Sequence, residues 1–165
     1  WEIRNTIEQF QQTTGVRIRA WRDHAYRHDK NTYRLLTDNG IEVVSDDVVP
    51  EWTRPYLHDE GIVSLPVNVM PDSDHMYHGY FTPTTTDGWS LQRSTFSPDM
   101  MYPEEWLERV KRQVLSTIET GGVATLLVHP APMQMIDDFS TFDKLCSFLT
   151  DFESMHVTEA ANYVK

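Results

Sequence analysis

The amino-acid sequence predicts an α/β fold in which short parallel strands alternate with amphipathic helices. Two observations carry this prediction. Segments with helical apolar spacing alternate with short β-branched or alternating segments, and polar, chemically active residues follow several of the predicted strands. In parallel sheets, function gathers at the carboxyl ends of the strands. The length of 165 residues suits one unit with a real core, so we predict a single unit over residues 1–165.

The first half of the chain begins with a predicted helix over residues 2–14. Ile3, Ile7 and Phe10 lie at helical spacing there, and Gly15 provides a natural end. The next elements are a strand over 16–21, a helix over 32–39, and strands over 41–45 and 60–69. Either Asp29 or Asn31 is expected to cap the helix over 32–39, which Gly40 ends.

The second half begins with a stretch from residue 70 to 101 that is rich in Pro, Asp, Thr and Gly. Loops of this length are usually functional or poorly ordered. Pro103 then sits at a typical first helical position, before an amphipathic helix that ends at Gly121 and Gly122. The last predicted elements are a strand over 123–128 and a helix over 137–152.

Charge and composition exclude several classes of function. The 14 Lys and Arg against 25 Asp and Glu give a net charge of −11, which argues against a nucleic-acid backbone or an anionic membrane surface as partner. The apolar run VATLLV has six residues, far fewer than the roughly 20 that span a membrane. With Cys146 as its single cysteine, the chain has no intrachain disulfide and no thiolate-based zinc site.

Polar side chains follow three of the predicted strands. They are Arg22, Asp23 and His24 after the first strand, Asp46 and Asp47 after the second, and His129 after the fourth. An arginine, a carboxylate and a histidine at one edge form a workable hydrolytic set, because they can stabilise negative charge, orient the imidazole and move a proton. A structural role for His129 and a surface ion pair for Arg22 are the alternatives.

A second cluster of candidate ligands lies in the segment DSDHMYHG, residues 72–79. Its metal-ligand types are Asp72, Asp74, His75 and His78. Their spacing matches no motif that places two histidines on one helical face. The Pro-Asp-Ser context favours a solvated loop, and a separate metal site is the alternative.

Aromatic residues are plentiful in and before the long stretch over residues 70–101. They are Trp52, Tyr56, Tyr77, Tyr80, Phe81 and Trp89. Rings of this kind can stack on sugar faces or fill a core. The sequence leaves both roles open for each of them.

Three segments resemble a known family in their order along the chain. AWRDHAYRHDKNTYRLLTDNGIEVVSDD (20–47), IVSLPVNVMPDSD (62–74) and TLLVHP (125–130) are similar to the C-terminal part of polysaccharide deacetylases of the NodB type. The resemblance extends from about Glu2 to Val164. It implies part of a distorted (β/α) barrel that lacks the N-terminal strands.

The resemblance also implies an activity, namely metal-dependent removal of N- or O-acetyl groups from a carbohydrate. His129 in L-V-H matches the family's general acid, and Arg22 in W-R-D-H-A-Y matches its groove arginine, although a histidine stands where proline is common. Asp46 or Asp47 would orient the catalytic histidine. The expected substrate contacts are His24, Tyr26 and Trp89.

The cofactor implied by the resemblance is a divalent metal, zinc or similar. The family's T-F-D-D and H-x-x-x-H segments, which supply the general base and the metal ligands, are expected upstream of this chain. The chain alone is therefore expected to be inactive, and to need the missing N-terminal segment or another chain to cover its sheet edge. The alternative is a noncatalytic carbohydrate-binding or assembly domain derived from the same barrel.

Overall fold

The structure, a computed structural model, describes residues 2–51, 53–72, 75–76, 96–97 and 100–164. The chain forms two compact units. Unit 1 consists of Trp1–Asp47, Arg54–Pro66 and Met155–Lys165, and unit 2 consists of Val48–Thr53 and Val67–Ser154. The hypothesis that residues 1–165 act as one unit of a deacetylase-like barrel stays a prediction.

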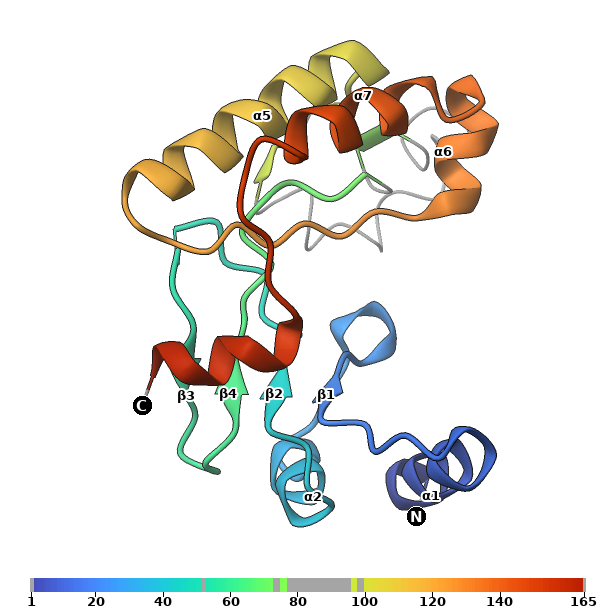
Figure 1. Cartoon of the computed structure of the whole chain (residues 1–165), viewed down its shortest axis with the longest axis vertical. Helices are drawn as coiled ribbons and strands as arrows, with labels where there is room; N and C mark the ends of the chain where they lie inside the picture. The colour runs from blue at the N-terminus through green and yellow to red at the C-terminus, as the bar shows by residue number, and fades with distance from the viewer. Residues whose placement is uncertain (1, 52, 73–74, 77–95, 98–99, 165) are drawn as a thin grey trace. The chain divides into compact units, whose positions relative to one another are not determined.

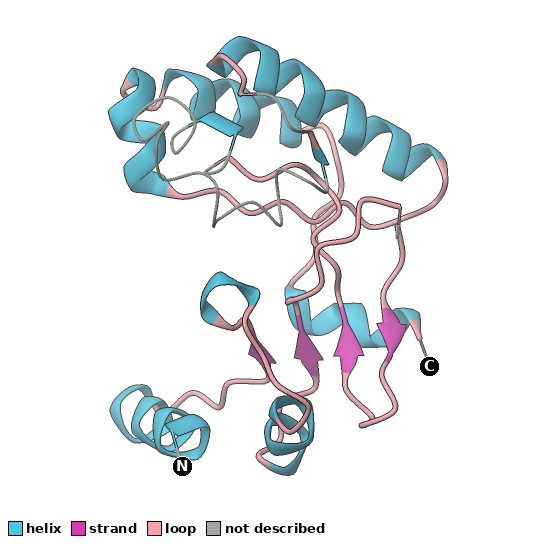
Figure 2. Cartoon of the chain, turned by 180° about the vertical axis from the view of Figure 1, so that it is seen from behind, coloured by secondary structure: helices cyan, strands magenta, loops and turns pink. Residues whose placement is uncertain are grey.

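Unit 1 is built on a small mixed sheet (Figures 1 and 2). Its strands, in spatial order, are β1 (Ala20–Trp21), β2 (Val43–Val44), β4 (Val63–Ser64) and β3 (Tyr56–Leu57). β1, β2 and β4 are parallel, and β3 is antiparallel to β4. Because β1 and β2 are parallel neighbours, the residues that follow them emerge at the same edge of the sheet.

Four helical elements accompany this sheet. They are α1 (Glu2–Thr14), the 3₁₀ helix η1 (His24–Tyr26), α2 (Thr32–Asp38) and the 3₁₀ helix η4 (Val157–Tyr163). α1 ends as predicted at Gly15, whose φ of 72° suits glycine. At the start of α2 the Asp29 carboxylate accepts the backbone N–H groups of Asn31 and Thr32, at 2.7 and 3.1 Å, so Asp29 supplies the capping bonds.

The core of unit 1 is small and apolar. Its buried members are Ile7, Tyr33, Leu36, Ile41, Val44 and Ile62. η4 adds a further contact, because it packs against β2 and buries Ala160 and Ala161. Strand, helix and C-terminal segment thus depend on one another for burial.

Leu36→Ala is expected to destabilise unit 1 by about 2–5 kcal/mol, since it removes a fully buried side chain and leaves a cavity. Leu35→Ala is the matched control, because Leu35 is 41% exposed whereas Leu36 is 0% exposed. The control should change the free energy of unfolding by about 0.5 kcal/mol or less. Urea unfolding followed by far-UV circular dichroism measures both. Equal losses for the two variants would contradict the placement of α2.

The described part of unit 2 is dominated by three helices, α5 (Pro103–Glu119), α6 (Pro130–Asp137) and α7 (Ser140–Leu149). α7 packs against both of the others. α5 begins with Pro103, as predicted, and the Glu105 carboxylate accepts the N–H of Tyr102 at 3.1 Å. The buried core of the unit is Val69, Met70, Met76, Phe96, Trp106, Leu107, Val110, Val114, Met133 and Leu145.

The predicted strand over 123–128 is wrong. This segment is irregular, and the Asn68 side chain provides bonds that a neighbouring strand would have made. Its amide group donates to the carbonyl oxygen of Val123 and accepts from the N–H of Thr125, both at 2.9 Å. Backbone groups make further bonds, since the Val123 N–H donates to Thr53 and the N–H groups of Asn68 and Val69 approach the carbonyl oxygen of Thr125. The segment is thus held without a regular ladder.

Two further expectations differ from the structure. The helix predicted over 137–152 is shorter than expected, because α7 occupies Ser140–Leu149. α6, which precedes it, was not predicted, and Asp138 and Phe139, with φ of 50° and 67°, separate the two helices. A left-handed pair interrupts helical hydrogen bonding. The observed strands are also shorter than the predicted ones, and the antiparallel strand β3 was not predicted. The α/β class is confirmed, whereas the barrel stays a prediction because the described residues form one four-stranded sheet.

Candidate functional site

The loops that follow β1 and β2 bring two carboxylates together. The backbone N–H of Asp23 donates to Oδ1 of Asp46 at 2.7 Å, and the Trp21 indole N–H donates to Oδ1 of Asp23 at 2.9 Å. His28, from the same loop as Asp23, completes a group of three. Each of these three side chains offers one ligand-type atom, and the three atoms lie within 4.8 Å of one another.

Asp46 is the most unusual carboxylate in this group. The residue is only 2% exposed, and its burial raises the pKa of its carboxyl above the ordinary value, although the N–H of Asp23 opposes that change. Among the residues that the structure describes, no donor reaches the buried Oδ2 of Asp46. The same is true of Oδ2 of Asp23. The pair therefore has unused acceptor capacity away from water.

Asp47, the next residue, has the opposite environment. Its Oδ2 accepts hydrogen bonds from the hydroxyls of Tyr56, at 2.6 Å, and Ser64, and lies 3.3 Å from Nε2 of His58. Burial raises the pKa of Asp47, but the three partners lower it by a larger amount, so the pKa of Asp47 lies below its ordinary value. Burial and Asp47 together raise the pKa of Tyr56 to about 12. Asp47 is thus engaged within the sheet of unit 1.

Arg22 connects the ends of β1 and β2. Its Nε donates to the carbonyl oxygen of Ser45 at 2.9 Å, and its Nη2 donates to the Ser45 hydroxyl at 2.6 Å. That hydroxyl donates in turn to the carbonyl oxygen of Leu65 at 2.7 Å. The guanidinium of Arg22 therefore binds Ser45, the residue directly before Asp46.

The expected substrate contacts have different environments. His24 is exposed in η1, whereas Tyr26 is buried. Ala25 and Tyr26 both have positive φ, 54° and 58°, a conformation that costs free energy in residues other than glycine. Trp89 lies outside the described residues.

His129 lies in unit 2, immediately before Pro130 at the start of α6. Fully buried Asp72 contacts it twice: Oδ1 is 2.7 Å from Nδ1 of the ring, and Oδ2 accepts the backbone N–H at 2.9 Å. The His129 side chain is itself 43% exposed. The structure thus fixes one side of an accessible imidazole with a buried carboxylate.

The expectation that residues 72–79 form a solvated loop is wrong for the described part of this segment. Asp72 binds His129, and His75 is buried with Nε2 3.2 Å from the carbonyl oxygen of Ser97. The other candidate ligands, Asp74 and His78, lie outside the described residues. The sequence signal for burial was the apolar run VNVMP directly before Asp72.

His28 was missed as a candidate although a signal was present. Its spacing to His24 is H-x-x-x-H, so the expectation that this pattern occurs only upstream of the chain is wrong. Of the two histidines, His28 belongs to the group with Asp23 and Asp46. The Tyr33 ring stacks on the His28 ring with centroids 4.6 Å apart, and its hydroxyl lies 3.4 Å from Nδ1.

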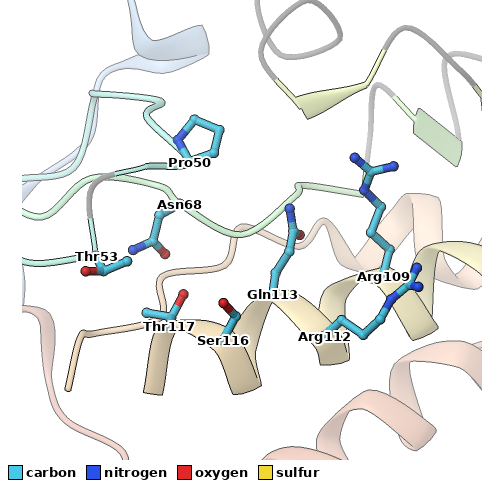
Figure 3. A pocket seen from close by; sticks show the side chains of 8 residues that line it. All are labelled: Pro50, Thr53, Asn68, Arg109, Arg112, Gln113, Ser116 and Thr117. Atoms are coloured by element: carbon cyan, nitrogen blue, oxygen red, sulfur yellow. The ribbon is translucent and has the colours of Figure 1, made fainter. Parts of the chain in front are cut away.

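Unit 2 also contains a pocket of about 370 Å³, lined mostly by residues with polar side chains (Figure 3). It is lined by Pro50, Thr53, Asn68, Arg109, Arg112, Gln113, Ser116 and Thr117. Gln113 accepts the N–H of Met70 at 3.0 Å, and Arg109 donates to the carbonyl oxygen of Phe96 at 2.9 Å. These wall residues therefore hold neighbouring backbone in place, and neither His129 nor Asp72 lines the pocket.

The fold is similar to that of a solved structure described as a "putative polysaccharide deacetylase from Mycobacterium smegmatis". The TM-score is 0.69 at 20% sequence identity. The similarity confirms the predicted resemblance to a deacetylase-type protein at the level of the fold. It covers 96% of this chain and 53% of the other, so the chain spans about half the length of that protein.

Neither a protein-family model nor a curated protein matches the sequence. Among the described residues, no helix has the length and apolar character needed to cross a membrane.

Proposed function

We propose that this chain forms part of a metal-dependent hydrolase that removes N- or O-acetyl groups from a carbohydrate, with His129 as the general acid. The observation that carries the proposal is the double contact between buried Asp72 and His129. An accessible imidazole held by a buried carboxylate is well suited to proton exchange. The similarity in fold to the mycobacterial protein described as a deacetylase supports the class of reaction.

The proposed chemistry assigns one proton transfer to this chain. Water adds to the acyl carbonyl and gives a proton to the general base expected on the further segment; the bond from the acyl carbon to the sugar nitrogen or oxygen then breaks, and His129 gives a proton to that leaving atom. Because Nδ1 contacts Asp72, this exchange is assigned to Nε2. Asp72 holds the ring orientation and stabilises its protonated form. Asp72 thereby takes the orienting role that was expected of Asp46 or Asp47.

Residues in the loop after β1 receive secondary roles in this proposal. Arg22 is a positioning residue, because its guanidinium holds Ser45 at the end of β2. Exposed His24 remains a proposed substrate contact, whereas buried Tyr26 is assigned a structural role. Trp89 stays a prediction.

A divalent metal ion is part of this proposal, since such an ion supplies Lewis-acid activation of an acyl carbonyl and of water. The need for a further segment or a second chain to complete the catalytic centre also stays a prediction. His129 and Asp72 are the contribution of this chain to acid catalysis.

Acetate release from N-acetylated chito-oligosaccharides tests the proposal, measured on the protein in its full natural length. We expect release that EDTA abolishes and added Zn²⁺ restores. The rival function, a noncatalytic carbohydrate-binding domain, predicts no acetate release, together with oligosaccharide binding that calorimetry finds unchanged by EDTA. That pair of results would contradict the hydrolase proposal.

A further inference from the structure

The group of Asp23, His28 and Asp46 has the composition of a metal site. The residues come from the loops after two adjacent parallel strands of unit 1, and their three ligand-type atoms lie within 4.8 Å of one another. A cluster of acidic residues alone carries little information, because such groups are common on protein surfaces. The degree of burial of Asp46 distinguishes this group.

The buried oxygens of the cluster are a second, independent observation. Asp46 is 98% buried, and its Oδ1 is already occupied by the N–H of Asp23. Its Oδ2 is shielded from water and reached by no donor within the described part of the chain, and Oδ2 of Asp23 is in the same condition. A buried carboxylate oxygen without a donor is costly, so such atoms point to a positive group that completes the site.

Among the described residues, no arginine or lysine donates a hydrogen bond to either oxygen. Arg22, a cation in the same loop, donates to Ser45 instead. The adjacent carboxylate, Asp47, has three partners of its own, so vacant acceptors are not a general property of this sheet edge. At this sheet edge, the lack of hydrogen-bond donors therefore concerns the carboxylates of Asp23 and Asp46.

The donor set defines the class of ion. Two carboxylate oxygens and one imidazole nitrogen suit a divalent first-row metal such as zinc, whereas calcium and magnesium prefer oxygen ligands alone. Two ligands of one zinc ion lie at most roughly 4 Å apart, given bonds of about 2 Å. The three atoms, all within 4.8 Å of one another, would have to draw closer around such an ion, and His28 is the exposed member of the group.

Contacts around the three side chains resemble those that hold metal ligands in place. The Trp21 indole N–H fixes Asp23, the Asp23 N–H fixes Asp46, and Tyr33 stacks on His28. Such outer contacts orient ligands and support affinity. We propose that Asp23, His28 and Asp46 bind a divalent transition-metal ion of the zinc type, with Asp46 as the buried anchor.

This inference does not depend on the hydrolase proposal, because it concerns binding by residues of unit 1. Three protein ligands leave at least one coordination position for water or another ligand. The site therefore has the form of an open centre rather than a closed structural one.

Calorimetric titration of Zn²⁺ into the EDTA-stripped, full-length protein at pH 7.5 tests the proposal. We expect a saturable site, separate from any metal centre completed by a further segment, that His28→Gln and Asp46→Asn each weaken by at least about tenfold. The matched controls, His24→Gln and Asp38→Asn, change exposed residues of the same unit and should leave the affinity unchanged. An excess of Mg²⁺ should not displace the zinc.

A second readout separates this site from zinc held at other histidines. In NMR spectra of the imidazole groups, added Zn²⁺ should shift the His28 resonances and leave those of His24 in place. Because His28 is exposed, His28→Gln should fold even if Asp46→Asn does not. Absence of saturable binding, or equal affinity in the parent and His28→Gln proteins, would overturn the proposal.

Discussion

His129→Ala is expected to lower the rate of acetate release by about 10²- to 10⁴-fold, the usual contribution of general acid–base catalysis. Asp72→Asn should cause a loss of similar size, because the amide no longer accepts from the ring as a carboxylate does. The losses should appear in kcat rather than in KM. Because the proposal assigns both side chains to one proton transfer, their losses should not add. The double variant should be about as slow as the slower of the two single variants.

Asp138→Asn provides the matched control for Asp72→Asn. It makes the same chemical change at an exposed residue of unit 2, where φ is 50° and asparagine is well tolerated. Its activity should equal that of the parent protein. NMR of the imidazole nitrogens adds a test of orientation, because loss of Asp72 should redistribute the His129 tautomers. A folded Asp72→Asn protein with parental kcat would remove the assigned role of Asp72.

Trp106→Ala is expected to destabilise unit 2 by about 3–5 kcal/mol, the usual cost of deleting a buried large aromatic side chain. Trp106 is fully buried, and its indole N–H lies 3.2 Å from the carbonyl oxygens of both Met70 and Pro71. These two residues directly precede Asp72. Loss of the indole should therefore disturb the segment that holds His129 as well as the core.

Urea unfolding followed by far-UV circular dichroism measures the effect of Trp106→Ala. Leu115→Ala is the control on the same helix, because Leu115 is exposed, and we expect a change of about 0.5 kcal/mol or less. Trp106→Phe keeps most of the volume but not the donor, so it should retain more stability than Trp106→Ala while still lowering kcat. If the free energy of unfolding of Trp106→Ala equalled that of the parent protein, the placement of Trp106 in the core would be incorrect.

Helices were predictable where local spacing and end signals agree. α1 matches its predicted range, and α5 begins at Pro103 as expected. Strand limits were harder to predict, because a strand is defined by partners far away in the sequence. Residues 123–128 illustrate this, since the side chain of Asn68 supplies two of their hydrogen bonds and backbone groups of Thr53, Asn68 and Val69 supply others. No pattern within six apolar residues contains that information.

The candidate site residues likewise include some that the sequence predicted and some contacts that it did not. Asp23 and Asp46 were found because both follow predicted strands, and parallel neighbours place such residues together. The contact between Asp72 and His129 joins residues 57 positions apart, and nothing in either local segment specifies it. His28 was visible as part of an H-x-x-x-H spacing, but its proximity to Asp46 depends on how the loop after β1 folds.

The interleaving of the two units has a consequence for biosynthesis. Unit 1 draws on the first 47 residues, on Arg54–Pro66 and on Met155–Lys165, so the chain passes between the units four times. During translation the early strands must wait for η4, which packs against β2, until almost the whole of this sequence has emerged from the ribosome. Neither unit can therefore be expressed as a continuous fragment, and a ribosome stalled before residue 155 would present a nascent chain whose N-terminal sheet is open to chaperones.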